Sequence, residues 1–151
     1  MGADRHFTFN RFISIISRCG QIYLDRELAP LKIGSGQVRI LKALGVQDGI
    51  SQERIRLLFH LDKATVAKAV KPLLREGYIT RERQVEDKRA YRVCLTDKGR
   101  GILPRLDEIL QAWAQILTAG LTAAEKRAVD ALLARMSENA RRQWRDHRST
   151  E

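Results

Sequence analysis

The sequence is poor in cysteine, proline and aromatic residues, and it lacks long apolar runs. Its 151 residues include two cysteines, three prolines and 6% aromatic residues. Cys19 and Cys94 stand far apart, so they make neither a disulfide framework nor a four-ligand zinc site. No apolar run approaches the ~20 residues that cross a bilayer, and the first residues, MGADRHFTFNRF, do not follow the pattern of a signal peptide. We therefore expect a soluble, cytoplasmic protein with no membrane partner.

Patterns of catalytic and metal-binding residues are missing as well. Gly34-Ser35-Gly36 is followed by Arg39 where a dinucleotide-binding loop has its third glycine. The three histidines, His6, His60 and His147, are scattered without metal-ligand spacing, and no serine lies in a Gly-x-Ser-x-Gly elbow. We expect no enzymatic activity, no metal and no cofactor.

Acidic residues are outnumbered by basic ones. Lys plus Arg number 28 and Asp plus Glu 18, which gives a formal net charge of +10 and a pI near 10.2. Residues 51–100 hold 13 basic and 7 acidic side chains, and so most of the excess. Such a charge indicates a polyanionic partner, usually nucleic acid, with an anionic membrane surface as the other candidate. The charge excess alone fits a solvated surface equally well, so the motifs must decide.

Two short helices separated by a brief break are predicted in this basic stretch. Ser51 is typical of a helix N-cap, Asp62 can cap the following helix, and Gly77 suits the C-terminus of that helix. The second helix has an apolar stripe made of Val66, Val70, Leu73 and Leu74. Its opposite side carries Lys68, Lys71 and Arg75. The pattern predicts a helix-turn-helix with a basic outer face. Pro72 has no N–H group, so we expect a kink or a weakened C-terminal half in the second helix.

Directly after Gly77 the spacing of apolar residues changes from the helical period to a period of two residues, which is typical of a strand. Tyr91, Val93 and Leu95 alternate with Arg92, Cys94 and Thr96, and Tyr78–Arg83 is a plausible partner strand. The segment between them, residues 84–89, is polar and charged. A β-hairpin with a basic tip that follows a helix-turn-helix is the winged-helix arrangement.

Helices are also expected on both sides of this region. An apolar stripe from Phe12 through Cys19 to Tyr23 predicts a helix that stops at Pro30, and Ser35 could cap the next helix. Thr96 can cap a long helix, and Thr122–Glu125 is a full capping box for the last one. A winged-helix body of about 65 residues cannot cover all the flanking apolar stripes, so we expect them to form a subunit interface. The residues expected in this interface are Phe12, Ile16, Tyr23, Leu132, Met136 and Trp144.

The predicted fold is therefore mainly α with a small β-hairpin wing. We expect one domain over residues 1–151, in which residues 35–100 form a winged helix-turn-helix. Residues 1–34 and 101–151 are expected to form flanking dimerisation helices.

The same stretch resembles the multiple antibiotic resistance regulator (MarR) family. The resemblance rests on Ser51-Gln52-Glu53, on Leu61 to Lys68, and on Asp87-Lys88-Arg89 followed by Leu95-Thr96-Asp97-Lys98-Gly99. It covers roughly residues 7 to 145, and the Asp-x-Arg and Leu-Thr-x-x-Gly pieces are its most specific parts. The resemblance implies a bacterial, homodimeric winged-helix transcription regulator, in most members a repressor. It also implies release from DNA on binding small phenolic or lipophilic compounds, or on cysteine oxidation.

Candidate DNA contacts lie on the second helix, at the start of the first helix and on the wing. Cations and short hydroxyls at a helix N-terminus reach phosphates and base edges, and a helix N-terminus itself favours a phosphate. The expected contacts are Ser51, Gln52, Lys63, Thr65, Lys68, Lys71, Lys88 and Arg89. By the family pattern Asp87 pairs with an arginine and shapes the wing, so Arg89 is either a minor-groove contact or the partner of Asp87.

The function expected from these features is regulation of transcription by a homodimer that reads pseudo-palindromic double-stranded DNA. We expect a repressor that a small apolar or aromatic effector relieves, with Tyr23 and Trp113 as candidate effector contacts. The alternatives are a non-specific or architectural nucleic-acid-binding protein, a winged helix that binds protein, and a thiol-based redox sensor. Cys19 lies on the apolar stripe, so we expect it to be buried and structural rather than reactive.

Overall fold

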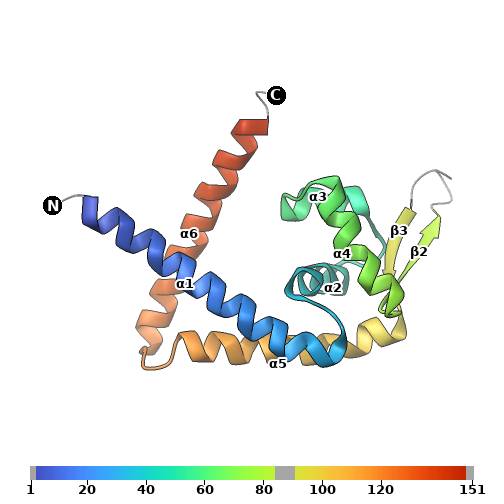
Figure 1. The fold of residues 1–151 in the computed structure, drawn as a ribbon, viewed down its shortest axis with the longest axis horizontal. Helices are drawn as coiled ribbons and strands as arrows, with labels where there is room; N and C mark the ends of the chain where they lie inside the picture. Colours follow the sequence, from blue (N-terminus) through green and yellow to red (C-terminus); the bar gives the residue numbers. More distant parts are fainter. Residues whose placement is uncertain (1–2, 84–90, 149–151) are drawn as a thin grey trace. The chain divides into compact units, whose positions relative to one another are not determined.

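The computed structural model describes residues 3–83 and 91–148, with side-chain burial for residues 8–83 and 91–143. The chain forms two compact units, Met1–Trp113 and Ala114–Glu151. The first contains α1 (Ala3–Leu28), a 3-10 helix η1 (Ala29–Leu31), α2 (Ser35–Val46), β1 (Ile50–Ser51), α3 (Gln52–Phe59), α4 (Lys63–Arg75), β2 (Ile79–Arg83) and β3 (Tyr91–Leu95) (Figure 1). Helix α5 (Asp97–Leu117) runs from the first unit into the second, and α6 (Ala123–Arg148) belongs to the second.

The core of the first unit joins α2, α3, α4, the small sheet and the start of α5. Its buried side chains include Leu41 and Leu44 of α2, Ile55 of α3, Val66, Val70 and Leu73 of α4, Val93 of β3 and Leu106 of α5. Leu28, at the C-terminal end of α1, is fully buried with them. The α4 stripe predicted from the sequence is thus inside, apart from Leu74, which is half-buried.

The sheet has three antiparallel strands in the order β1-β3-β2. The hairpin register pairs Ile79 with Leu95 and Arg83 with Tyr91, which agrees with the predicted strands. The sequence prediction missed β1, a two-residue strand in which Ile50 pairs with Val93. Two residues are too short for an alternating pattern to be recognised, so only a turn was expected there.

Four of the predicted helix caps are present. Ser51 accepts a hydrogen bond from the Arg54 N–H at 3.0 Å, Asp62 from the Thr65 N–H at 2.8 Å, and Thr96 from the Gly99 N–H at 3.0 Å. Thr122 and Glu125 make the reciprocal bonds of a capping box. Ser35, in contrast, is not a cap, because α2 begins one residue earlier than expected. Gly34 is its N-cap and donates its N–H to the Gln37 side chain.

Helix α4 continues through Pro72 to Arg75, so the proline does not end the helix. Proline removes one N–H donor only. The carbonyl groups of Pro72 and Leu73 still accept from the N–H groups of Glu76 and Tyr78, both at 2.9 Å. Gly77 then ends the turn with φ of 72°, a conformation that glycine adopts without strain.

The Leu-Thr-x-x-Gly segment joins the wing to α5 through a close backbone approach. The Thr96 hydroxyl donates to the Gly77 carbonyl at 2.7 Å, and a Cβ on Gly99 would lie 2.0 Å from the Tyr78 carbonyl oxygen. Position 99 therefore accepts no side chain, and the close packing of this turn against Tyr78 explains the glycine of the motif in this chain.

Candidate nucleic-acid interface

Helix α4 has two chemically distinct faces. Val66, Val70 and Leu73 are at most 1% exposed, and the exposed side of the helix carries Lys63, Thr65, Lys68 and Lys71. The four side chains predicted to contact DNA thus lie on the solvent side of one helix. Long cations on an exposed helix face can reach phosphates and base edges in a groove.

The N-terminus of α4 is held by Asp62 and Thr65. The Thr65 N–H donates to Asp62 Oδ1 at 2.8 Å, and the Thr65 hydroxyl donates to Asp62 Oδ2 at 2.5 Å. These bonds lower the pKa of Asp62, with the Thr65 hydroxyl as the largest cause. Because the hydroxyl hydrogen of Thr65 is already used, Thr65 can only accept a hydrogen bond from a partner at this surface.

The N-terminus of α3 brings together Ser51, Gln52 and an arginine that the sequence analysis did not single out. With the Gln52 amide oriented so that its oxygen faces Arg81 of β2, it accepts from Arg81 Nε at 3.1 Å and Nη2 at 2.7 Å. Gln52 therefore positions a cation of the wing, in addition to any contact of its own. The signal in the sequence was the pair Arg81 and Arg83, which alternate along β2 on the same side as buried Ile79.

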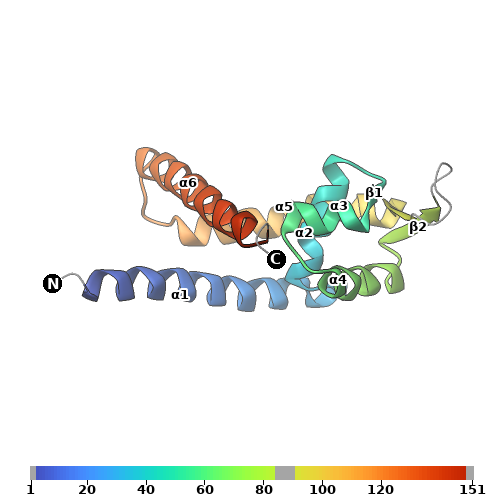
Figure 2. The same cartoon turned by 90° about the horizontal axis from the view of Figure 1, so that it is seen from above.

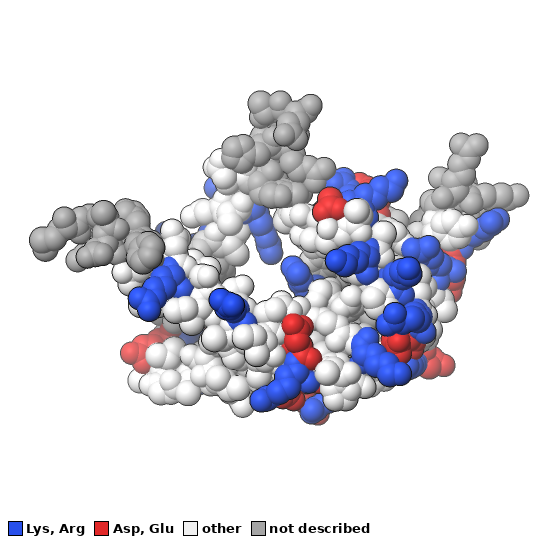
Figure 3. Space-filling model, viewed as in Figure 1, with Lys and Arg blue, Asp and Glu red and all other residues white. Residues whose placement is uncertain are grey.

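Basic side chains gather over α3, α4 and the strands, with acidic ones interspersed (Figure 3). Some cations are engaged within the chain: Arg56 with Glu53 at 2.6 Å, Arg75 with Glu76 at 3.0 Å, and Arg83 over the Tyr91 ring at 5.9 Å. Asp87, Lys88 and Arg89, predicted for the wing tip, lie outside the described residues. Strand β2 ends at Arg83 before that segment, and strand β3 begins at Tyr91 after it.

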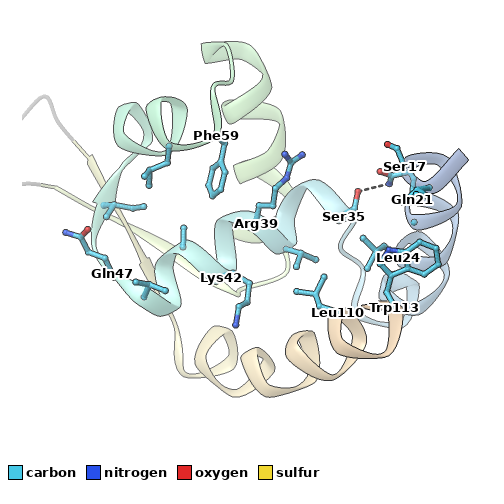
Figure 4. Close-up of a pocket in the computed structure, with 17 residues that line it drawn as sticks. Ser17, Gln21, Leu24, Ser35, Arg39, Lys42, Gln47, Phe59, Leu110 and Trp113 are labelled. Carbon is cyan, nitrogen blue, oxygen red and sulfur yellow. Dashed lines mark hydrogen bonds between the residues drawn. The ribbon is translucent and has the colours of Figure 1, made fainter. Parts of the chain in front are cut away.

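A cavity of about 860 Å³ opens between α1, α2, α3 and α5 within the first unit. Its wall is largely apolar, with Ile16 and Leu24 from α1, Val38 from α2, Phe59 from α3, and Leu110 and Trp113 from α5. Arg39 and Lys42 add cationic groups, and the Gln21 amide donates to the Ser35 hydroxyl at 2.6 Å along one side (Figure 4). Lys42 is paired with Asp107. The cavity has the size and the apolar lining of a small-molecule site.

Of the two predicted effector residues, only Trp113 lines this cavity. Tyr23 lies behind it, with the two rings stacked at a centroid distance of 5.2 Å. Gly20 allows this packing, because a Cβ there would lie 3.2 Å from the Trp113 ring. Tyr23 therefore supports the wall of the cavity rather than forming it.

Two of the three predicted dimer residues on α1 are exposed in the single chain. Phe12 is 58% exposed and Ile16 48%, and Tyr23 is half-buried (Figure 2 shows α1 extending beyond the winged helix). In the second unit Leu132 is 54% exposed and Met136 is half-buried, and the side chain of Trp144 lies outside the described residues. The expectation that Cys19 is buried is wrong for the single chain, where its side chain is exposed on the same face of α1 as Phe12 and Ile16.

Within the described residues, no helix is long and apolar enough to cross a membrane. No group of three or more His, Cys, Asp or Glu side chains there has an arrangement that could hold a metal ion.

A helix-turn-helix with a basic outer face, followed by a β-hairpin that forms a three-stranded sheet with β1, defines a winged-helix protein. Comparisons with known proteins identify the family of winged-helix proteins to which the chain is similar. The model of the MarR family matches residues 33–91. The crystal structure of a MarR transcriptional regulator from Methanosarcina mazei Go1 is 37% identical and covers 89% of this chain and 97% of that one, with a TM-score of 0.84. The uncharacterised HTH-type transcriptional regulator YybA of Bacillus subtilis is 28% identical over 89% of each chain.

The chain belongs to the MarR family of winged-helix transcriptional regulators. It is a regulator of transcription and not an enzyme. A third similar protein, a putative MarR family regulator from Listeria monocytogenes, was crystallised with a 26mer DNA. It is 25% identical over 89% of each chain, with a TM-score of 0.80.

Proposed function

We propose that the protein is a homodimer that binds a pseudo-palindromic DNA sequence and represses transcription until a small apolar or aromatic effector binds. In this proposal residues 35–100 contact DNA, and residues 1–34 and 101–151 join the two subunits. The observation that carries the DNA-binding part is the division of α4 into a buried apolar stripe and an exposed face with Lys63, Lys68 and Lys71. The DNA complex of the similar Listeria protein supports it.

The proposal of a homodimer rests on the uncovered apolar faces. On α1, Phe9, Phe12, Ile13, Ile15, Ile16 and Ile22 are each between 44% and 64% exposed. A face of this size is costly in water, and a second copy of the chain is the partner that two-fold DNA symmetry requires. A dimer then reads half-sites whose centres are about 10 bp apart. Light scattering at micromolar concentration should give twice the chain mass, and a monomer there would contradict the dimer.

The DNA-binding part is tested by selecting bound sequences from random DNA with the purified protein. We expect an inverted repeat, bound at least ~10³-fold more tightly than a scrambled duplex at physiological salt. Equal affinity for both duplexes, with the steep salt dependence of phosphate contacts, would instead indicate an architectural binder. Failure to bind any DNA would favour a winged helix that binds protein.

The effector part is supported by the apolar cavity with Trp113 in its wall. A ligand acts only through its different affinities for the DNA-competent and DNA-incompetent states, and a tenfold effect needs about 1.4 kcal/mol. A panel of phenolic and lipophilic compounds should contain members that raise the melting temperature and release the selected DNA. Trp113→Ala should abolish both responses, whereas Ile116→Ala, on the same helix but outside the cavity lining, should keep them. If no compound gives either response, the effector part is wrong and the DNA-binding part is unaffected.

A further inference from the structure

The C-terminal end of α4 is hydrogen-bonded to the segment that follows α1 through one buried tyrosine. Tyr78 follows the α4 C-terminus and is 4% exposed. Its hydroxyl donates to the Leu31 carbonyl, the last of η1, at 3.0 Å. This contact spans 47 positions of sequence and joins the helix expected to meet DNA to the connection between α1 and α2.

The Leu31 carbonyl and the Tyr78 hydroxyl have few alternative hydrogen-bond partners. The Leu31 carbonyl stands at the end of the 3-10 helix, where no following turn continues the hydrogen-bond series. A tyrosine hydroxyl in an apolar interior also requires an acceptor. Burial raises the pKa of Tyr78, with a further contribution from Glu76, so the hydroxyl keeps its proton for the carbonyl.

A second contact joins the same two segments. Lys32 Nζ lies 4.0 Å from Glu76 Oε2, and Lys32 has the left-handed conformation with φ of 55°. Glu76 is the C-cap residue of α4. The turn after α1 is thus attached to the α4 C-terminus by a neutral hydrogen bond inside and an ion pair outside.

The position of Tyr78 itself is fixed on its other sides. Lys98 of α5 lies 4.4 Å from the centre of the Tyr78 ring and donates to the Glu76 carbonyl at 2.6 Å. The Tyr78 carbonyl accepts from the Thr96 N–H at 3.1 Å. Because ring and backbone are both held, a shift of the Leu31 segment is transmitted to α4 rather than absorbed by Tyr78.

We infer that Tyr78 is a positioning residue that fixes the recognition helix against α1, and thereby sets the half-site spacing that the dimer accepts. The inference rests on the proposed function, since α1 joins the subunits there and α4 contacts the DNA. If α4 is attached rigidly to α1, the distance and rotation between the two recognition helices are fixed, and DNA with a different spacing fits poorly. If the bond is removed, the C-terminal end of α4 is held less firmly against the Leu31 segment, and DNA with other spacings is tolerated better.

The test compares the selected DNA site with two versions that have one base pair inserted or deleted between the half-sites. The wild-type protein should bind the altered sites at least about tenfold more weakly than the selected site. Tyr78→Phe keeps the ring and removes the hydroxyl, so the difference should fall to about threefold or less, with unchanged affinity for scrambled DNA. Ser137→Ala on α6 is the matched control, because it also removes one hydroxyl that donates to a backbone carbonyl, that of Ala134 at 2.8 Å, and leaves Tyr78 and Leu31 unchanged. It should discriminate between spacings as the wild type does.

The outcomes separate this inference from the proposed function. Wild-type spacing preference in Tyr78→Phe would overturn the inference and leave the DNA-binding proposal intact. Absence of any sequence preference in the wild-type protein would overturn both. Should Tyr78→Phe melt below the assay temperature, both proteins are assayed below its melting temperature, and a wild-type spacing preference of the variant there would overturn the inference.

Discussion

Helices α1 and α4 are both amphipathic, yet only one of them has its apolar stripe covered by the chain itself. Val66 and Leu73 of α4 are 1% and 0% exposed, whereas Phe12 and Ile16 of α1 are 58% and 48% exposed. The apolar period of a helix thus identifies which face seeks burial. It does not identify whether the same chain or a second one covers that face.

The same difference appears between the two ends of α1. Leu28, at its C-terminal end, is fully buried in the core of the first unit, and Tyr23 and Leu24 are half-buried against that core. From Phe9 to Ile16 the apolar side chains are exposed. The C-terminal end of α1 therefore belongs to the winged-helix core, and its N-terminal part is the segment that we assign to the subunit interface.

The largest effect is expected from a charge on the uncovered part of α1. Phe12→Asp would bury a carboxylate in the proposed interface twice per dimer, at a cost of several kcal/mol for each. We expect the dimer dissociation constant to rise ~1000-fold or more. The helical circular dichroism of the winged-helix body should persist, because Phe12 is outside its core. Sedimentation equilibrium over a range of concentrations measures the change, and unfolding of the variant would mean that the N-terminal part of α1 is also needed for the fold of the single chain.

A smaller effect, on folding rather than association, is expected in α4. Leu73→Ala removes a fully buried side chain and should lower the free energy of unfolding by about 3 kcal/mol, within the usual 2–5 kcal/mol for such a change. Chemical denaturation measures it. Lys68→Ala, on the exposed side of the same helix, is the control and should unfold like the wild type. Equal destabilisation by both variants would contradict the two-faced description of α4.

The features predicted correctly from the sequence are those that local chemistry determines. Ser51, Asp62, Thr96 and Thr122 cap helices because a short oxygen-bearing side chain before an amphipathic segment satisfies the first N–H groups. The hairpin follows from the alternation around Val93. The two-residue strand β1 was missed because it depends on pairing with β3, which is distant in sequence. The cap at Gly34 was missed because the hydrogen bond there is accepted by the Gln37 side chain and not by the capping residue.

The candidate site was predicted in part for the same reason. The exposed lysines of α4 follow from helical spacing, but the bond between Gln52 and Arg81 links two segments that are not adjacent in sequence. The exposure of Cys19 could not be predicted, because the apolar period of α1 says nothing about the partner that covers it. The bond from Tyr78 to Leu31 has no sequence signal, since any aromatic residue satisfies the pattern at position 78.

On the exposed face of α4, removal of one cation should affect DNA and not folding. Lys68→Ala should weaken binding of the selected site by ~1–3 kcal/mol and relax the preference at one position of the site. A fluorescence titration with the selected and the scrambled duplex separates the two effects. Lys126→Ala, an exposed lysine of α6, is the matched control and should bind both duplexes like the wild type. Unchanged affinity and preference in Lys68→Ala would remove α4 from the DNA interface.

The smallest effect is expected at Cys19, and it depends on the covered state of α1. Cys19 is exposed in the single chain, on the same stripe as Phe12 and Ile16, so the proposed dimer covers it. A thiol in an apolar interface does not favour the thiolate that peroxides attack. Cys94 is protected differently, because burial raises the pKa of its thiol and the neighbouring carboxylates of Glu82 and Asp48 raise it further.

A thiol reagent should therefore modify Cys19 slowly in the wild-type dimer and rapidly in dissociated Phe12→Asp. Mild peroxide should leave DNA binding unchanged in the wild type and in Cys19→Ser. Release of DNA by peroxide in the wild type, lost in Cys19→Ser, would show that this face of α1 is open in the dimer and would make the protein a redox sensor.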